Sequence, residues 1–463
     1  MTTRRALLVV CAIALLHGAF FIWYQRPDWN TEWSDQEGYK RLGAVFASTG
    51  QFTRYPDSPT FIPEVIRTPA YPMFVAAAYR IGGVSQMSVA VAQTMVFAAI
   101  CLLVFATARR ITSEPIAIAA AAATALFSPL PYFGALVMTE LWTAFLLTAA
   151  MWATIRAAQT RTPAAFALAG MLFGITALSR PVFALFPVAM ALVGLVLLPL
   201  FRARPRPAAS GWIVLAVAGM LTLVPWFTYN YVYLGRFTMS PAGGIGRGIW
   251  EGSWPGTWSG RLQSELTSLA EDAPDRATLD AQVGAVAARE HLDVHVMLKY
   301  VHQWSDIRRI WTTPTDPVER TTARISADQE YLRVGLDNIR NQTTGHLARR
   351  LARGVFILWA ADIPFRYSTI NQLPPLVIRL CWLVQAALMA AGLWGLYVLG
   401  RQGRAVEAWL LAAPIIYVTA VHGILLTESR QSLPAKPDLV LVAIIGIAAL
   451  LPFKPQVHER EHL

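Results

Sequence analysis

The segment EWSDQEGYKRLG, from Glu32 to Gly43, follows the first apolar run and combines acidic side chains with a tyrosine and bases. Asp35 would lie in the first turn of a helix, where the helix dipole keeps a carboxylate ionised and able to accept a proton from a hydroxyl group. Ser34 and Glu37 have the spacing of a capping box, in which Glu37 bonds to the backbone at the helix start. The segment is therefore either a solvated helix start or part of a catalytic site.

Further ionisable residues lie at the ends of apolar runs, where a charge is costly. Glu140 precedes Arg156 by 16 residues, which is about 24 Å of helix and places Glu140 near the outer boundary. Arg180 follows an apolar run of similar length, and Arg67 and Arg430 lie in outer connections. Each arginine alone could be an anchor at the level of the lipid headgroups. Together they predict one cluster of carboxylates and arginines at a single depth.

The composition indicates that these residues are carried by membrane-spanning helices. Of 463 residues, 55% are hydrophobic and only 14% are charged, with a mean hydropathy of +0.43, whereas soluble domains carry about 25% charged residues. Apolar runs that are long enough to cross a bilayer lie near 6–24, 86–108, 113–128, 132–155, 163–179, 181–200, 211–228, 375–399, 405–426 and 438–453. We therefore expect an all-α bundle of about ten spans.

Basic residues gather in the short connections on one side of these spans, which is typical of the cytoplasmic side. They are Arg4, Arg5, Arg109, Arg110, Arg156, Arg161, Arg202, Arg204, Arg206, Arg401, Arg404 and Lys454. The long segments 25–85 and 229–374 mix acids with bases, so we expect them on the opposite, periplasmic side, with both termini cytoplasmic. The net charge of +11 then marks topology and does not predict binding of nucleic acid.

The same pattern predicts three parts of the chain. Residues 1–228 form a first transmembrane module, whose outer loop (25–85) carries the candidate catalytic motif. Residues 229–374 form a large outer segment, polar from about 261 to 350 and helical in character, which predicts a small helical cap. Residues 375–463 contain the last spans.

Other candidate sites are weak or absent in the sequence. There is no nucleotide-binding glycine motif and no cysteine spacing typical of zinc or disulfides. An enzyme acting outside the cytoplasm would then need another kind of activated donor, and a lipid-linked donor fits. His17 and His422 lie within apolar runs, where they either line a cavity or pack as hydrogen-bonded residues. The tryptophans of WEGSWPGTW, from Trp250 to Trp258, could stack on sugars or lie at the membrane interface.

The order of several short motifs resembles the integral-membrane glycosyltransferases of the GT-C fold, in particular the bacterial family 39-like branch related to protein O-mannosyltransferases and lipid A aminoarabinose transferases. The matching elements are Asp35-Gln36 with Tyr39, RTPAYP at Arg67 to Pro72, Thr139-Glu140, Ser179-Arg180-Pro181, PWFTYNYVYLGRF at Pro225 to Phe237, and Arg430 with Pro434. Two positions depart from the family pattern. Gln36 stands where the family has a second acid, and Gln431 stands where it has a tyrosine.

The resemblance implies an enzyme that transfers a sugar, with inversion, from a polyprenyl-phosphate donor to a glycan, lipid or protein acceptor at the periplasmic face of a bacterial inner membrane. Asp35 would be the base, and Glu37 could stand in for the missing second carboxylate. Glu140 would orient an arginine or a sugar hydroxyl, and Arg67, Arg180 and Arg430 would bind the leaving phosphate. The same motifs implicate Tyr39, Tyr71 and Asn230 in substrate binding. No metal-ligand set is predicted, although the chemistry is compatible with a divalent cation.

Two other functions are compatible with part of the pattern. Charges near membrane spans also mark substrate pathways in transporters and lipid flippases. Against this, the sequence shows no internal repeat, and its charges gather at one face instead of crossing the core. A ligase or polymerase of lipid-linked glycans with a different fold is the third alternative.

Overall fold

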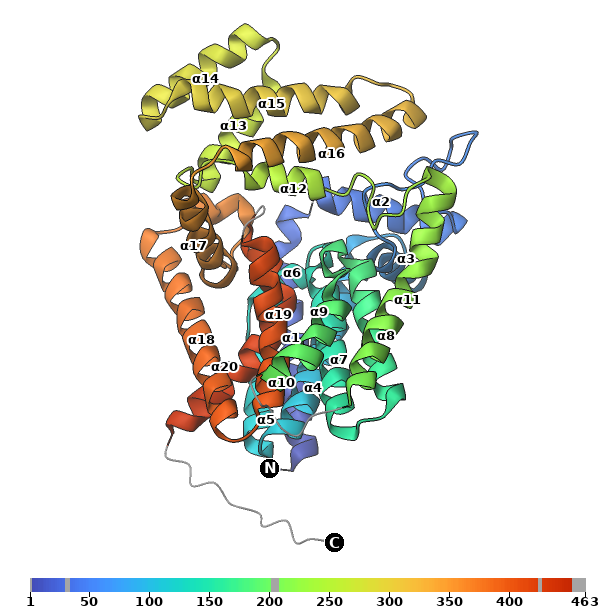
Figure 1. Ribbon diagram of the computed structural model, residues 1–463, viewed down its shortest axis with the longest axis vertical. Helices are drawn as coiled ribbons and strands as arrows, with labels where there is room; N and C mark the ends of the chain where they lie inside the picture. Colours follow the sequence, from blue (N-terminus) through green and yellow to red (C-terminus); the bar gives the residue numbers. More distant parts are fainter. Residues whose placement is uncertain (1, 30–33, 201–207, 424–426, 452–463) are drawn as a thin grey trace.

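The computed structural model describes residues 2–29, 34–200, 208–423 and 427–451, and every regular element within these ranges is a helix. Figure 1 shows an upright bundle of long helices with a smaller group of helices lying across one end. The predicted all-α fold is confirmed.

Eight helical segments of the described chain are long and apolar enough to cross a membrane. They are α1 (Thr3–Gln25) with its 3-10 extension, α4 (Gln86–Ile111), α7 (Thr139–Thr160), the run from Pro181 to Leu200 that includes α9 (Phe186–Leu192) and α10 (Leu198–Leu200), α11 (Ala209–Leu234), α18 (Pro375–Arg401), α19 (Ala405–His422), and η5 with α20 (Ser429–Leu450). Two shorter apolar helices, α5 (Glu114–Ala125) and α8 (Pro163–Ser179), take the places of two further predicted spans. The ten segments agree with the predicted count.

The predicted boundaries fail between α5 and α7. The sequence predicted that a span begins near residue 132, but residues Pro129–Gly134 form a separate short helix, α6, and α7 begins only at Thr139. Proline fits the first turn of a helix and breaks its interior, so the SPLP sequence ends one helix and starts another. As a result, Glu140 lies in the first turn of α7, at the start of that span.

His17 of α1 compensates for this break. Its Nδ1 lies 2.9 Å from the carbonyl oxygen of Ala125, the last residue of α5, and its Nε2 lies 3.4 Å from Oγ of Ser128. A carbonyl group at a helix end needs such a partner inside a membrane. His17 is therefore a hydrogen-bonded packing residue.

Glycines allow the long helices to pack closely. A Cβ on Gly170 of α8 would lie 2.1 Å from the carbonyl oxygen of Leu215 in α11, and one on Gly395 of α18 would lie 1.8 Å from that of Val442 in α20. Close packing at small residues is the usual way in which helices associate inside membranes. These contacts fix the frame that carries the outer loops.

Two helices, α2 (Ser34–Thr49) and α3 (Ala70–Gly82), lie at the end of the bundle that faces the cap (Figure 1). A Cβ on Gly43 of α2 would lie 2.4 Å from a methyl group of Val75 in α3, and Tyr39 packs edge-on against Tyr71 with ring centroids 4.9 Å apart. This packing fixes the rotation of α2, so Asp35 and Tyr39, one turn apart, share a face.

The cap contains α12 (Ile245–Gly252), α13 (Gly260–Asp272), α14 (Arg276–Glu290), α15 (Val294–Thr312) and α16 (Pro317–Arg340), and α17 (Thr344–Ala360) leads back to the bundle. Its core contains Trp250, Trp254 and Trp258, each at most 3% exposed, packed against Tyr300 and Trp304. Because these tryptophans are buried in the cap, they offer no open ring faces for stacking on a sugar.

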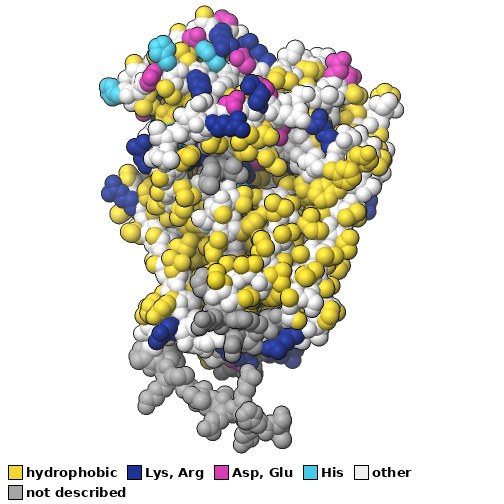
Figure 2. All heavy atoms as spheres, in the orientation of Figure 1, with side chains coloured by type: hydrophobic (Ala, Val, Ile, Leu, Met, Phe, Trp, Pro, Cys, Tyr) yellow, Lys and Arg dark blue, Asp and Glu magenta, His cyan; other side chains and the backbone are white. Residues whose placement is uncertain are grey.

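The surface is divided as expected for a membrane protein. On the face shown in Figure 2, hydrophobic side chains cover the bundle, while charged side chains gather on the cap and at the opposite end. The N-terminus of the chain and the end of α20 both lie at the end opposite the cap (Figure 1). The two long outer segments of the sequence analysis therefore lie together, away from the termini.

Candidate active site

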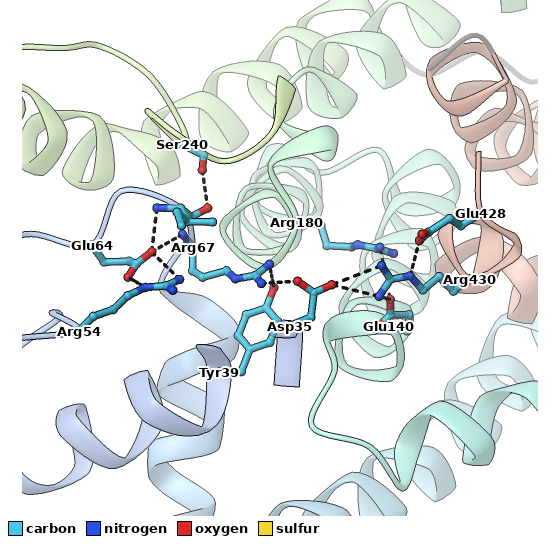
Figure 3. A network of polar contacts seen from close by, with 11 residues as sticks. Asp35, Tyr39, Arg54, Glu64, Arg67, Glu140, Arg180, Ser240, Glu428 and Arg430 are labelled. Atoms are coloured by element: carbon cyan, nitrogen blue, oxygen red, sulfur yellow. Dashed lines mark hydrogen bonds and ion pairs between the residues drawn. The ribbon is translucent and has the colours of Figure 1, made fainter. Parts of the chain in front are cut away.

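Asp35 lies at the centre of a network of ion pairs between the bundle and the cap (Figure 3). Its Oδ1 accepts a hydrogen bond from Nη2 of Arg67, and its Oδ2 lies 3.3 Å from both Nη1 and Nη2 of Arg430. The carboxylate thus bridges two arginines that are more than 360 residues apart in the sequence. Asp35 is the second residue of α2, so this bridge ties the start of α2 to both arginines.

Arg67 is held by contacts on both its side chain and its backbone. Its Nη1 donates to the hydroxyl oxygen of Tyr39 at 3.2 Å, and its guanidinium carbon lies 4.4 Å from the centre of the Tyr39 ring. The backbone N–H groups of Ile66 and Arg67 both donate to Oε1 of Glu64. Glu64 is buried and also receives two hydrogen bonds from Arg54.

Glu140 and Arg180 come from two neighbouring spans. Glu140 is only 1% exposed, and its Oε1 lies 3.5 Å from Nη2 of Arg180. Arg180 follows the last residue of α8 and has an extended backbone (φ −136°, ψ 111°), as expected for a residue that precedes a proline. Pro181 therefore ends α8 at the position from which Arg180 reaches Glu140.

Arg430 connects the two halves of the network. Its Nη1 lies 3.6 Å from Oε1 of Glu140, and its Nε donates to Oε2 of Glu428. It lies in the 3-10 helix η5 (Ser429–Ala435), which begins with a capping box formed by Glu428 and Gln431. Gln431, the second departure from the family pattern, thus orders the turn that presents Arg430.

We call these seven residues the Asp35 cluster: Asp35, Tyr39, Arg67, Glu140, Arg180, Glu428 and Arg430. Three polar atoms of the cluster are buried and have no hydrogen-bond partner among the described residues. They are Nε of Arg67, Nη1 of Arg180 and Oε2 of Glu140. Since such atoms are usually paired in folded proteins, they are available to a ligand with anionic and hydroxyl groups.

The arginines control the charge of Asp35. Burial alone would raise the pKa of this carboxyl group, but the guanidinium groups of Arg67 and Arg430 outweigh burial and hold the pKa below its usual range. Burial raises the pKa of Tyr39. At neutral pH the cluster therefore presents an ionised Asp35 beside a neutral tyrosine hydroxyl group.

Three sequence-predicted site residues lie outside the cluster. Glu37 is exposed and pairs with Lys40 at 2.8 Å. Tyr71 is buried beneath Tyr39 and donates its hydroxyl to Gln93, and Asn230 donates to the backbone of Thr238 near the end of α11. The structure thus gives these side chains other partners.

Gln36 also points away from the cluster. Its Oε1 accepts hydrogen bonds from the backbone N–H of Val137 and from Gln86. Among the described residues, no group of three His, Cys, Asp or Glu side chains could hold a metal ion. Asp35, Glu140 and Glu428 are instead paired with arginines.

Sequence reasoning missed Glu64, Arg54 and Glu428. Glu428 lies two residues before Arg430 in the segment TESR, and Glu64 lies three residues before Arg67. An acid close to two of the three motif arginines, Arg67 and Arg430, was therefore visible in the sequence. Its role was not, because the contacts of Glu64 with two backbone N–H groups depend on how the loop folds.

The fold is similar to that of GT-C integral-membrane glycosyltransferases. The structure resembles the oligosaccharyltransferase of Archaeoglobus fulgidus in its apo form, with a TM-score of 0.53 and 13% identity over 96% of this chain and 50% of that one. It also resembles AglB from Archaeoglobus fulgidus solved with an inhibitory peptide and a dolichol-phosphate, with a TM-score of 0.51 and 14% identity over 96% and 50% of the two chains. The chain therefore spans about half the length of these proteins.

More narrowly, the family model for dolichyl-phosphate-mannose-protein mannosyltransferases matches residues 66–229. The matched part contains Arg67, Glu140 and Arg180 and excludes Asp35 and Arg430. The resemblance to GT-C glycosyltransferases that was expected from the sequence is confirmed.

Two other comparisons add little. ArnT from Cupriavidus metallidurans bound to undecaprenyl phosphate aligns over 96% of this chain and 77% of that one at 13% identity, but the TM-score of 0.40 is too low to support a conclusion. No curated protein matches the sequence significantly.

Proposed function

We propose that the protein transfers a sugar from a polyprenyl-phosphate donor to a hydroxyl group of an acceptor at the periplasmic face of a bacterial inner membrane. The observation that carries this proposal is the Asp35 cluster, in which the Asp35 carboxylate lies between Arg67 and Arg430. Arg67 and Arg180 each have one buried N–H group without a partner among the described residues. A phosphate group needs cationic N–H donors such as these arginines, and a nucleophilic hydroxyl group needs a base such as this carboxylate.

The arginines account for the leaving group. When the bond between the anomeric carbon and the phosphate oxygen breaks, the electron pair stays on the phosphate, whose charge grows from about −1 to about −2. Groups that bind this charge more tightly in the transition state accelerate the reaction. Arg67, Arg180 and Arg430 offer planar guanidinium groups that match phosphate oxygens in pairs.

Asp35 accounts for the nucleophile. The acceptor hydroxyl group gives its proton to the Asp35 carboxylate while its oxygen forms a bond to the anomeric carbon from the side opposite the phosphate. The products are an inverted glycoside, a protonated Asp35 and polyprenyl phosphate. A phosphate leaves without protonation, so one base is sufficient. Glu140, with its unpaired Oε2, is placed to accept a hydrogen bond from a sugar hydroxyl group.

The neighbours support a lipid-linked donor. The AglB structure was solved with a dolichol-phosphate and a peptide, and the matching family model describes a mannosyltransferase that uses dolichyl-phosphate mannose. We therefore place the sugar donor in the outer part of the bilayer, with its phosphate at the Asp35 cluster. The acceptor is a glycan, a lipid or a protein.

The test is a donor-consumption assay in proteoliposomes. Purified protein is supplied with a polyprenyl-phosphate sugar labelled in the sugar and with an envelope extract as the source of acceptor. We expect the label to leave the lipid fraction and polyprenyl phosphate to accumulate, and Arg180→Met to abolish both. A donor that crosses the bilayer unchanged would instead identify a flippase, and a donor that is neither consumed nor moved would refute the proposal.

A further inference from the structure

Two of the arginines that would bind the donor phosphate, Arg67 and Arg430, are paired with Asp35 in the structure. Nη2 of Arg67 and both Nη atoms of Arg430 contact the two oxygens of Asp35, one arginine on each oxygen (Figure 3). The base and the leaving-group cations of the proposed reaction are thus paired with each other.

This pairing conflicts with catalysis in two ways. A carboxylate that accepts hydrogen bonds from two guanidinium groups is a weaker base than a free one, because both contacts stabilise its ionised form. The same contacts use the N–H groups that a phosphate would need. Carboxylate and phosphate oxygens are alternative partners for the same guanidinium edges, so Asp35 and a phosphate compete for Arg67 and Arg430.

The third arginine is different. Among the described residues, no contact joins Arg180 to Asp35, and the contact of Arg180 with Glu140 is long, at 3.5 Å. Its Nη1 and the Nε of Arg67 are buried and unpaired among the described residues. Asp35 therefore leaves these two N–H groups unused, whereas it holds Nη2 of Arg67 and both Nη atoms of Arg430.

We propose that Asp35 occupies the phosphate-binding position of the free protein and is released by the donor phosphate, so that the base becomes available only after the donor has bound. This inference rests on the proposed function and adds an order to it, with the donor binding before the acceptor reacts. Arg67 and Arg430 turn from Asp35 to the phosphate, and the freed carboxylate then faces the acceptor hydroxyl group.

The arrangement also has a consequence for selectivity. The sequence predicts that the cluster lies at the depth of the lipid headgroups, where phosphates of ordinary phospholipids are abundant. Any anion must displace Asp35 before it can bind both arginines, which lowers the affinity for all phosphates by the same factor. Only a ligand with further contacts, such as a sugar hydroxyl group on Glu140, recovers that loss.

Binding of a polyprenyl monophosphate without a sugar tests the inference, because this probe cannot react. Its dissociation constant is measured in detergent for the parent, for Asp35→Asn and for Asp57→Asn. The last variant is the matched control, since Asp57 is an exposed aspartate of the same outer segment and its replacement causes the same change in charge. We expect Asp35→Asn to bind the probe about tenfold more tightly or better and Asp57→Asn to bind within about twofold of the parent.

The outcomes separate the inference from the proposed function. If the parent binds the probe and Asp35→Asn binds it equally or more weakly, Asp35 does not occupy the phosphate-binding position. The proposed function would then remain intact. If neither the parent nor the variant binds the probe, both fail. If Asp35→Asn does not give a folded protein, as judged by elution and thermal unfolding, Asp35→Ser removes the same charge with a smaller side chain, and the same tightening is expected.

Discussion

Replacement of Glu64 separates the positioning of Arg67 from the chemistry. Glu64 is 2% exposed, and its Oε1 accepts from the backbone N–H groups of Ile66 and Arg67 and from Arg54, while its Oε2 accepts from Nε of Arg54 (Figure 3). Glu64→Ala removes all four contacts, and Glu64→Gln keeps one oxygen for the two backbone groups. The two variants should therefore differ.

The contacts set the size of the effects. Loss of one partner of a buried ion pair costs about 3–5 kcal/mol, and we expect the lower end for Glu64→Ala because the Arg54 side chain is 21% exposed. Glu64→Gln should lower the free energy of unfolding by about 1–2 kcal/mol, since glutamine lacks the charge but keeps the backbone contacts. Displacement of Arg67 by about 1 Å would slow turnover about a hundredfold. We expect this loss for Glu64→Ala, and at most a tenfold loss for Glu64→Gln.

The assay combines thermal unfolding with donor turnover by the purified variants. Glu319→Ala serves as the control, because Glu319 is exposed in the first turn of α16. Its replacement should lower the free energy of unfolding by only about 0.5 kcal/mol. If Glu64→Ala turned over donor at the parent rate, the claim that Glu64 positions Arg67 would be wrong. Equal losses of activity in the alanine and glutamine variants would also contradict it.

Three further predictions follow from the cluster and the topology. Arg180→Lys should keep part of the turnover, because lysine keeps the charge without the paired N–H groups of the guanidinium, while turnover of Arg180→Met should fall about a hundredfold or more. Parent turnover in the methionine variant would show that Arg180 is only a membrane anchor. Alkaline phosphatase fused near Ala281 should be active, and a fusion near Thr162 should be inactive. The reverse result would show that the Asp35 cluster faces the cytoplasm. Because the pKa of Asp35 is lowered in the folded protein, its contribution to stability is complete above the unfolded-state pKa of about 3.9 and is lost as the pH falls towards the folded-state value. The difference in unfolding temperature between the parent and Asp35→Asn should therefore shrink below about pH 4, and a difference that stays constant from pH 7 to pH 3 would contradict the ion pairs.

The depth of the site residues in the membrane could be predicted from the sequence, because depth can be counted in residues along a helix. Glu140 and Arg180 each lie about one bilayer thickness from a basic connection, and this spacing placed both near one face before any contact was known. The structure brings them together with Arg430. Long apolar runs and basic connections are strong local signals, which is why the approximate number of apolar spans could also be predicted.

The partners of each side chain could not be predicted in the same way. Glu37 and Asp35 are separated by one residue, yet Glu37 is exposed beside Lys40 and Asp35 bridges two arginines. The difference depends on the rotation of α2, which is set by the packing of Gly43 against Val75. Contacts between segments far apart in the chain decide such rotations, and a single sequence does not contain them.

The tryptophan run of the cap illustrates the same limit. From the sequence, Trp250, Trp254 and Trp258 could have stacked on sugars or lain at the membrane interface. They are buried against Tyr300 and Trp304 of α15. Their role was decided by a helix about 40 to 50 residues further along the chain.

Donor turnover by purified Asp35→Asn, measured beside Glu37→Gln, tests the central claim most directly. Asparagine keeps the shape of the side chain but cannot accept a proton at neutral pH, so turnover should fall by about a hundredfold to ten-thousandfold while the folded protein is still recovered. Glu37→Gln should stay within a few fold of the parent, because Glu37 is exposed and contacts only Lys40 among the described residues. An Asp35→Asn variant that consumes the donor at close to the parent rate would contradict the account, since no other carboxylate of the cluster lies between Arg67 and Arg430 in the described chain.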